Sequence, residues 1–220
     1  MSAAFCLLVV AKAPVPGFAK TRLCPPATPE QAADIAAAAL LDTLDAVAAT
    51  PGAVPVVAAT GDFTRAAQAG KLTRALAGVR VVPQRGESFG ERLANAHADT
   101  AAVCPGLPVL QIGMDTPQVT ASLLAGAARE LSSRDAVLGH AEDGGWWALG
   151  LRDPLAARVL AGVPMSRPDT GALTRAALTG AGLRTGRLPE LSDVDTMPVA
   201  ERVARECDGR FPAAVAAVGS

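Results

Sequence analysis

The sequence predicts a single α/β domain built around a mostly parallel central sheet. Short apolar runs, which suit buried strands, alternate along the chain with alanine-rich segments whose apolar residues recur at helical spacing. The chain has 220 residues, 50% of them hydrophobic and 19% charged, so it can bury the core that such a domain needs. We expect residues 1–210 to form the domain and residues 211–220 to form a C-terminal tail, with residues 212–220 fraying.

The first strand and the first helix have the clearest local signals. Residues 5–10 are apolar throughout and too few for most helices, which predicts a central strand. Thr28, Pro29 and Gln31 predict the start of a helix, because Thr28 can cap it and Gln31 can complete a capping box. The buried face of this helix is predicted from residues spaced three or four apart: Ala33, Ala37, Leu40, Leu44 and Val47.

The rest of the chain continues the same alternation. Strands are expected at residues 54–59, 79–82, 108–112, 136–139 and 146–151, with a further extended segment at 183–188. Helices are expected at residues 64–77, 90–102, 120–132, 170–181 and 197–206. Ligands bind outside the carboxyl ends of the strands in such sheets, so the loops that follow the strands are the candidate functional segments.

Composition excludes several classes of partner. Twenty Lys and Arg residues balance 21 Asp and Glu residues, and aromatic residues are only 3%, so we expect no nucleic-acid binding. No apolar run reaches the ~20 residues that a membrane span needs. The four scattered cysteines form no CxxC pair, which favours reduced thiols in a cytoplasmic protein over a zinc site or a disulfide framework.

A basic loop follows the first strand. Lys12, Gly17, Lys20, Thr21 and Arg22 lie in it, and they are the candidate phosphate-binding residues. Arginine can hold phosphate oxygens with two hydrogen bonds and lysine can hold them as a point charge, while glycine lets the backbone come close. The loop is neither a Walker A loop nor a GxGxxG motif, and a solvated basic turn is the alternative interpretation.

Acidic residues occupy two other loops. Asp115 follows the strand at 108–112 and could hold Mg²⁺ or Mn²⁺, although a turn or a helix cap is an equal alternative. Asp193 and Asp195 would point the same way from an extended segment, which suits one divalent cation, or one metal ligand plus one helix cap. Two caps for the helix at 197–206 are the alternative.

The segment 139–147 combines carboxylates, glycines and tryptophans. Asp143 and Glu142 are the candidate catalytic bases. Gly144 and Gly145 permit close approach to a substrate, and Trp146 offers a flat apolar face to a sugar or base. A hairpin turn is the alternative, because Asp-Gly is a strong turn signal.

Two further polar loops complete the set. After the third strand, Gln84 could bind a base edge and Arg92 could reach phosphate, although a plain connecting loop explains them equally well. The loop at residues 165–171 could cap the next helix or contribute to an acceptor pocket.

These segments together resemble a known group. In chain order they read APVPGxxKTRL, GxRL, GxDxP, AEDGGWW and DVDT. The pattern resembles a bacterial family of GT-A-like nucleotide-diphospho-sugar transferases, long classified as a domain of unknown function, in which some members are named arsenosugar-biosynthesis glycosyltransferases. The piece at residues 19–23 is also similar to the phosphate loop of 2-phospholactate guanylyltransferases and, more loosely, of molybdenum cofactor guanylyltransferases.

The resemblance implies a GT-A, Rossmann-like fold of three layers that binds a nucleotide together with Mg²⁺ or Mn²⁺. Lys20 and Arg22 would then bind phosphate, Asp115 and Asp195 would share the cation, and Gly144 and Gly145 would lie near the sugar or acceptor. The chain departs from the family in having Thr116 where Cys is frequent and Trp146 where Tyr or Phe is frequent. It also lacks the mid-chain DxD of metal-dependent GT-A glycosyltransferases.

Three functions fit these residues. The leading hypothesis is a nucleotide-sugar-dependent glycosyltransferase in which cations stabilise the departing diphosphate while a small-molecule acceptor attacks. A nucleotidyltransferase that releases pyrophosphate from an NTP is the alternative, since Lys12, Lys20 and Arg22 would suit a triphosphate. A non-catalytic nucleotide-binding protein is the third. The residues do not indicate the oligomeric state.

Overall fold

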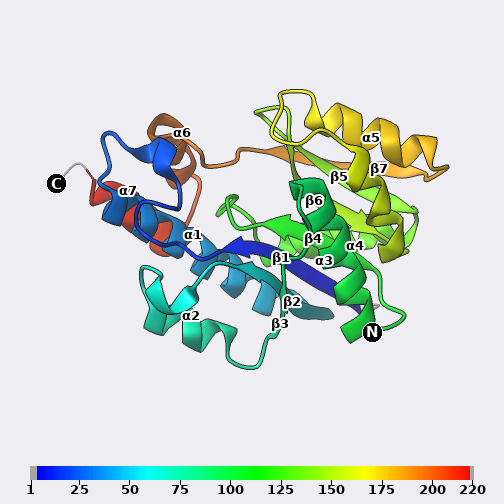
Figure 1. The fold of residues 1–220 in the computed structure, drawn as a ribbon, viewed down its shortest axis with the longest axis horizontal. Coiled ribbons are helices and arrows are strands. Elements are labelled where there is room, and N and C mark those ends of the chain that lie inside the picture. The colour runs from blue at the N-terminus through cyan, green and yellow to red at the C-terminus, as the bar shows by residue number, and fades with distance from the viewer. Residues whose placement is uncertain (1–3, 219–220) are drawn as a thin grey trace.

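The computed structural model describes residues 4–218, which form one seven-stranded sheet between two layers of helices (Figure 1). The strand order is β3-β2-β1-β4-β6-β5-β7. Within the described residues β6 alone runs antiparallel to its neighbours, and every other adjacent pair is parallel. The prediction of an α/β domain with a mostly parallel sheet is confirmed.

The elements follow the order expected from the sequence. The strands are β1 (Phe5–Lys12), β2 (Ala53–Thr60), β3 (Arg80–Pro83), β4 (Val109–Gly113), β5 (Ala136–Ala141), β6 (Trp146–Leu151) and β7 (Thr185–Leu191). The α-helices are α1 (Pro29–Ala48), α2 (Ala69–Leu76), α3 (Phe89–Val103), α4 (Ala121–Ser132), α5 (Thr170–Gly180), α6 (Met197–Ala204) and α7 (Arg210–Ala216). Three short 3₁₀ helices are η1 (Thr21–Leu23), η2 (Phe63–Arg65) and η3 (Pro154–Gly162).

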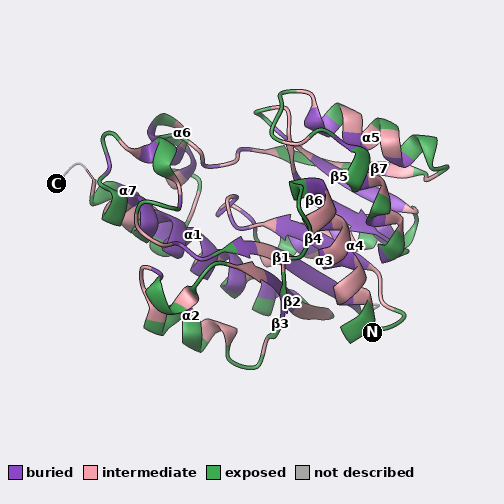
Figure 2. Ribbon diagram, in the orientation of Figure 1, coloured by how far each residue is buried: buried purple, intermediate pink, exposed green. Residues whose placement is uncertain are grey.

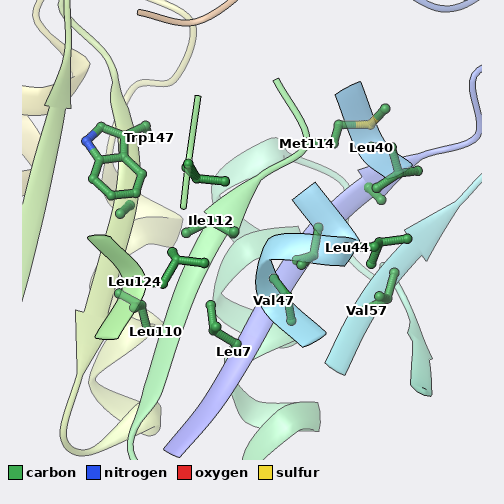
Figure 3. Packing of buried hydrophobic residues seen from close by; sticks show 14 of the residues in the cluster. Leu7, Leu40, Leu44, Val47, Val57, Leu110, Ile112, Met114, Leu124 and Trp147 are labelled. Carbon is green, nitrogen blue, oxygen red and sulfur yellow. The ribbon is translucent and has the colours of Figure 1, made fainter. Parts of the chain in front are cut away.

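Alternation along the strands divides the core between the two faces of the sheet. Leu7 and Leu110 face α1 and α4, where they pack with Leu44 and Leu124 (Figure 3). The opposite faces of β1, β2 and β4 pack against α3, and those of β5 and β6 pack against η3 and α5. Figure 2 shows that the central strands β1, β4, β5 and β6 are mostly buried, whereas the edge strand β3 is mostly exposed.

Helix α1 begins where the sequence predicts it. The Thr28 hydroxyl accepts a hydrogen bond from the Gln31 amide, and the Gln31 side chain accepts one from the Thr28 amide. One side of α1 packs on the sheet and the other packs against α6 and α7, which lie beside it in Figure 1. This double coverage explains why α1 is apolar well beyond the single face read from its spacing.

The C-terminal segment differs from the expectation that residues 212–220 fray. Residues 210–216 form α7, and Phe211 is fully buried. The Asp42 carboxylate of α1 accepts hydrogen bonds from the backbone amides of Arg210 and Phe211, and so satisfies the first turn of α7. Because Asp42 lies 168 residues before Arg210, no local pattern could have indicated this contact. Residues 219–220 lie outside the described residues.

Two other differences between the structure and the sequence predictions each involve a single segment. The predicted helix at 64–77 is broken into η2 and α2, with Gln68 at a φ of 54° between them. Residues 154–162, which had no predicted structure, form η3 against α3. A Cβ on Gly90 would lie 2.2 Å from the Leu160 carbonyl oxygen, so glycine is required for this packing.

Among residues 4–218, no helix combines the length and apolar character that crossing a membrane requires.

The sheet has its topological switch point between β1 and β4. From β1 the chain proceeds to β2 and β3 on one side, whereas β4 lies on the other side, so the loops after β1 and β4 diverge. After β7 the chain crosses the molecule to reach α6, as the orange segment of Figure 1 shows. The Val194 amide in this segment donates a 2.9 Å hydrogen bond to the Asp115 carbonyl, which places residues 192–196 over the switch point.

Candidate functional site

A cleft of about 670 Å³ opens at the carboxyl ends of β1 and β4. Its lining includes nine residues that the sequence singles out as candidates: Lys12, Lys20, Thr21, Arg22, Asp115, Asp143, Gly145, Trp146 and Asp195. These residues come from four separate loops and strand ends, so the fold brings together most of the predicted site.

Lys20 lies at the centre of the charged part of the cleft. Its ammonium is 2.9 Å from Asp115 Oδ2 and 2.7 Å from Asp195 Oδ1, and its side chain is only 12% exposed. Burial opposes the charge on the ammonium, but the charges of Asp115 and Asp195 outweigh burial and hold the pKa of Lys20 above its usual value. Lys20 therefore bridges the two carboxylates that the sequence assigns to a metal.

Asp193, which the sequence pairs with Asp195 as a possible metal ligand or helix cap, also lines the cleft. Burial, followed by the charges of Asp115 and Asp143, raises the pKa of the Asp193 carboxyl to about 7, although Lys20 opposes the shift. Four carboxylates thus share one region with a single buried ammonium. The Asp-Val-Asp spacing is the sequence signal for Asp193, because it predicts that both carboxylates point the same way. The folded structure then shows that the two residues line the same cleft.

Hydrogen bonds from neighbouring loops hold residues 191–194, which include Asp193, at the carboxyl edge of the sheet. Besides the Val194–Asp115 bond, the Glu142 amide donates to the Leu191 carbonyl at 3.0 Å. The Gln118 side-chain amide donates to the Ser192 carbonyl at 2.8 Å. These contacts join the ends of β4, β5 and β7, so the position of Asp193 depends on Gln118.

Replacing Gln118 with alanine is expected to raise the KM for the substrate that binds in this cleft about threefold, because losing one neutral hydrogen bond costs about 0.5–1.5 kcal/mol. Steady-state kinetics measures this. Gln31→Ala is the matched control, since Gln31 also donates to a backbone carbonyl, that of Ala217, but far from the cleft. An unchanged KM in Gln118→Ala would contradict the role of the Gln118–Ser192 hydrogen bond in positioning Asp193.

The carboxylates suit a hard divalent cation in their chemistry. Magnesium is usually held by one or two carboxylates together with phosphate oxygens and water, and Asp115 and Asp195 could supply those carboxylates. Within residues 4–218 no three His, Cys, Asp or Glu side chains converge closely enough to hold a metal by themselves. Asp115, Asp143, Asp193 and Asp195 place more carboxylates around Lys20 than its one ammonium balances, and a divalent cation would neutralise the excess. The residues present therefore fit such a cation when phosphate completes the ligand set.

The other two positively charged side chains of the first loop, Arg22 and Lys12, differ in whether they can reach a ligand. Arg22 is 76% exposed at the cleft and its Nη1 is 3.5 Å from Asp195 Oδ2, so its guanidinium can reach a ligand. The Lys12 ammonium donates a 2.7 Å hydrogen bond to the Phe18 carbonyl and thereby braces the loop. Lys20 itself adopts φ 49° and ψ 39°, a left-handed conformation that directs η1 away from the strand.

The β5–β6 connection is a hairpin, as one interpretation of the sequence proposed. Asp143 lines the cleft and its Oδ1 accepts a hydrogen bond from the Gly145 amide at 2.8 Å. Glu142 instead points to α6, where it forms an ion pair with Arg202. That pairing lowers the pKa of Glu142 and makes it a poor proton acceptor. Of the two carboxylates that the sequence offers as bases, Asp143 lines the cleft and Glu142 does not.

Gly144 packs closely against another loop of the same chain, and this packing explains why a glycine is needed there. It has a φ of 88°, and a Cβ there would lie 1.8 Å from the Pro168 carbonyl oxygen. The Gly171 amide donates to the Gly144 carbonyl at 2.8 Å. Gly144 therefore fixes the hairpin against the loop at 165–171, and Gly145 is the glycine that lines the cleft.

Three other predicted binding residues do not line the cleft. The Gln84 amide donates to the carbonyls of Ala11 and Ala58, which ties β3 to β1 and β2. The Arg92 guanidinium stacks 5.5 Å from the centroid of the Phe89 ring. Gly17 supplies a φ of 76° in the exposed part of the first loop. Their observed contacts are structural.

The two tryptophans have different surroundings. Trp147 is 1% exposed, and its indole nitrogen donates to the Pro189 carbonyl. Trp146 is half-buried in the cleft wall, and its indole nitrogen donates to the Thr174 hydroxyl at 3.2 Å. Trp146 thus presents a fixed ring to a ligand. The cleft also contains Met165 and Arg167, which belong to the loop that the sequence offers for an acceptor pocket. Three further lining residues had no role assigned from the sequence: Phe18, Phe89 and Gln111.

Comparison with known proteins places the chain in a family. Residues 43–167 match the model of a family described as "Uncharacterized protein conserved in bacteria (DUF2064)". The chain belongs to this family. No curated protein matches the DUF2064 chain in sequence.

Solved structures share its fold. A protein of Desulfovibrio desulfuricans G20, provisionally described as a nucleotide-diphospho-sugar transferase, is 26% identical, with 98% of each chain covered and a TM-score of 0.79. A CMP:2-keto-3-deoxy-manno-octonic acid synthetase, solved with CTP, is 12% identical over 91% of this chain and 97% of its own, with a TM-score of 0.58. Rv0371c of Mycobacterium tuberculosis H37Rv, solved with manganese, is 19% identical over 92% and 98%, with a TM-score of 0.53. The DUF2064 chain thus has the nucleotide-diphospho-sugar transferase fold, and the proteins to which it is similar are transferase enzymes.

Proposed function

We propose that this protein is a glycosyltransferase that takes its sugar from a nucleotide sugar. One observation carries the proposal: the cleft at the switch point combines exposed Arg22, the Lys20–carboxylate cluster and the Trp146 ring. Cations suit a diphosphate, carboxylates suit a divalent cation, and a flat apolar ring suits a sugar. The likeness to the Desulfovibrio protein supports the same donor class.

Each group has a role in this reaction. Arg22 and Lys20 bind the diphosphate, and Asp115 and Asp195 would hold Mg²⁺ or Mn²⁺. Such a cation would supply positive charge to stabilise the leaving diphosphate. Asp143 accepts the proton of the acceptor hydroxyl as that oxygen attacks the anomeric carbon, and Trp146 supports the sugar ring. The glycosidic bond to the diphosphate breaks as the new one forms, and a nucleoside diphosphate leaves.

Nucleotidyl transfer is the second candidate. Lys12, Lys20 and Arg22 lie on one loop at the cleft and could serve a triphosphate. The CTP-bound synthetase with the same fold supports this alternative. An acceptor phosphate would attack the α-phosphorus, and pyrophosphate would leave.

Product analysis separates these functions. The protein is incubated with panels of nucleotide sugars and NTPs, small-molecule acceptors and Mg²⁺ or Mn²⁺, and the released phosphates are identified. We expect a free nucleoside diphosphate from a nucleotide sugar. Pyrophosphate from an NTP would replace this proposal with nucleotidyl transfer, and binding without turnover would replace it with a nucleotide-binding protein.

Replacing Arg22 with alanine is expected to weaken nucleotide binding about tenfold, since a charge-assisted hydrogen bond contributes about 1.5–3 kcal/mol. Titration calorimetry with a nucleoside diphosphate and Mg²⁺ measures the change. Arg74→Ala, which removes an exposed arginine of α2 outside the cleft, is the matched control. Equal affinity in both variants would remove Arg22 from the phosphate site.

A further inference from the structure

The floor of the cleft contains a buried amide that the proposed reaction does not yet use. Gln111 lies in the middle of β4, paired with Leu8 of β1 and Leu149 of β6. It lines the cleft but is only 2% exposed. Within the described residues its Oε1 has no hydrogen-bond partner. A buried amide oxygen without a partner lowers stability, so a ligand that donates a hydrogen bond to it gains affinity.

His97 lies beneath Gln111 on α3. It is fully buried, and neither ring nitrogen has a hydrogen-bond partner within residues 4–218. Burial lowers the pKa of His97, and the nearby Gln111 side chain opposes that shift, so the two side chains are neighbours even though their polar atoms do not reach hydrogen-bonding geometry. Phe89, Leu93 and His97 follow one another every four residues, so they share the face of α3 that meets the sheet.

The walls around Gln111 are apolar and partly aromatic. Phe89, Leu93, Trp146 and Met165 line the same cleft. The indole of Trp146 is fixed by its hydrogen bond to Thr174, so it presents a constant surface. A sugar ring has apolar C–H faces and hydroxyl edges, which match a flat aromatic wall beside one buried amide.

We propose that Gln111 determines sugar specificity by hydrogen-bonding a ring hydroxyl of the substrate, and that His97 is the positioning residue that orients the Gln111 amide. This inference rests on the proposed function and names its substrate class, a polyhydroxylated ring. That ring belongs to the donor sugar or to the acceptor. In both cases the hydroxyl pairs with an amide that otherwise stays unpaired, so a ring lacking that hydroxyl binds more weakly.

Gln111→Met tests the proposal because methionine matches the length of glutamine and removes only the amide. The probes are UDP-glucose, ADP-glucose, GDP-mannose and CDP-glucose, each compared by calorimetry with its own nucleoside diphosphate in Mg²⁺. If the ring is the donor sugar, we expect Gln111→Met to bind the preferred nucleotide sugar about tenfold more weakly and the nucleoside diphosphate equally well. If the ring is the acceptor, donor binding stays constant and the acceptor KM rises by the same factor, with kcat nearly unchanged.

His97 is tested in the same assays. His97→Leu is expected to raise the same Kd or KM about threefold, and His97→Asn, which restores a polar group, is expected to recover part of the loss. The Tm of Gln111→Met should be no lower than that of the wild type, since an unpaired amide is removed.

The outcomes distinguish this inference from the proposed function. Normal nucleotide-sugar binding by the wild type, with donor affinity and acceptor KM unchanged within twofold in Gln111→Met, would overturn the inference alone. Failure of the wild type to bind any of the four nucleotide sugars would overturn the proposed function and this inference together.

Discussion

Lys20→Met is expected to lower kcat/KM for the nucleotide substrate by about 10²–10³-fold and to make the fold depend on divalent cations. The Lys20 ammonium lies 2.9 Å from Asp115 and 2.7 Å from Asp195. Without it, the partly exposed carboxylates of Asp115 and Asp195 and the more buried carboxyl of Asp193 repel one another. Under the proposed function, the variant removes a positive charge both from the folded cleft and from the site that binds the leaving diphosphate.

Thermal unfolding measures the second effect. Mg²⁺ or Mn²⁺ should raise the Tm of Lys20→Met more than that of the wild type, because the cation replaces the missing charge. Lys71→Met, which removes an exposed lysine of α2, is the matched control for the loss of a positive side chain. Wild-type activity in Lys20→Met, or equal metal responses in the two proteins, would show that Lys20 is not the central cation.

A double variant isolates the electrostatic cause. Adding Asp115→Asn to Lys20→Met removes one of the repelling carboxylates and is expected to recover part of the Tm without restoring activity. Recovery of activity would instead mean that Asp115 has no role in binding the metal and nucleotide.

The sequence predicts the fold and the loops of the site because both have local signals. The apolar run at residues 5–10 and the capping box at Thr28 each specify an element without reference to the rest of the chain. Asp115 and Lys12 could be placed at one sheet edge because the strands before them are parallel. The topology alone therefore brings the first loop and the β4 loop together.

The contacts within the site depend on tertiary structure. Lys20 and Asp195 are 175 residues apart, and Glu142 and Arg202 are 60 apart. No spacing rule indicates that Lys20 bridges two carboxylates or that Arg202 withdraws Glu142 from the cleft. Gln111 has a local signal in the sequence, because it is the polar residue inside an apolar strand. A polar side chain in such a position faces either a hydrogen-bond partner or a cavity.

The second large effect is a loss of stability in acid caused by His97. Burial lowers the pKa of His97 from 6.5 to about 4, with Gln111 as the opposing influence. As the pH falls below 6.5, the unfolded chain binds a proton at this histidine while the folded chain does not, so unfolding becomes easier. Near pH 4 the folded chain binds the proton as well, and the loss levels off at about 3 kcal/mol.

His97→Leu removes this dependence while leaving every carboxylate in place. The free energy of unfolding, measured in urea at intervals from pH 7 to pH 4, is expected to fall further in the wild type than in His97→Leu, with the difference approaching about 3 kcal/mol. The general loss from protonating Asp and Glu side chains is common to both proteins and cancels in the comparison. Parallel stability curves would mean that His97 is charged or hydrated in the folded state, and the buried pair with Gln111 would then be wrong as well.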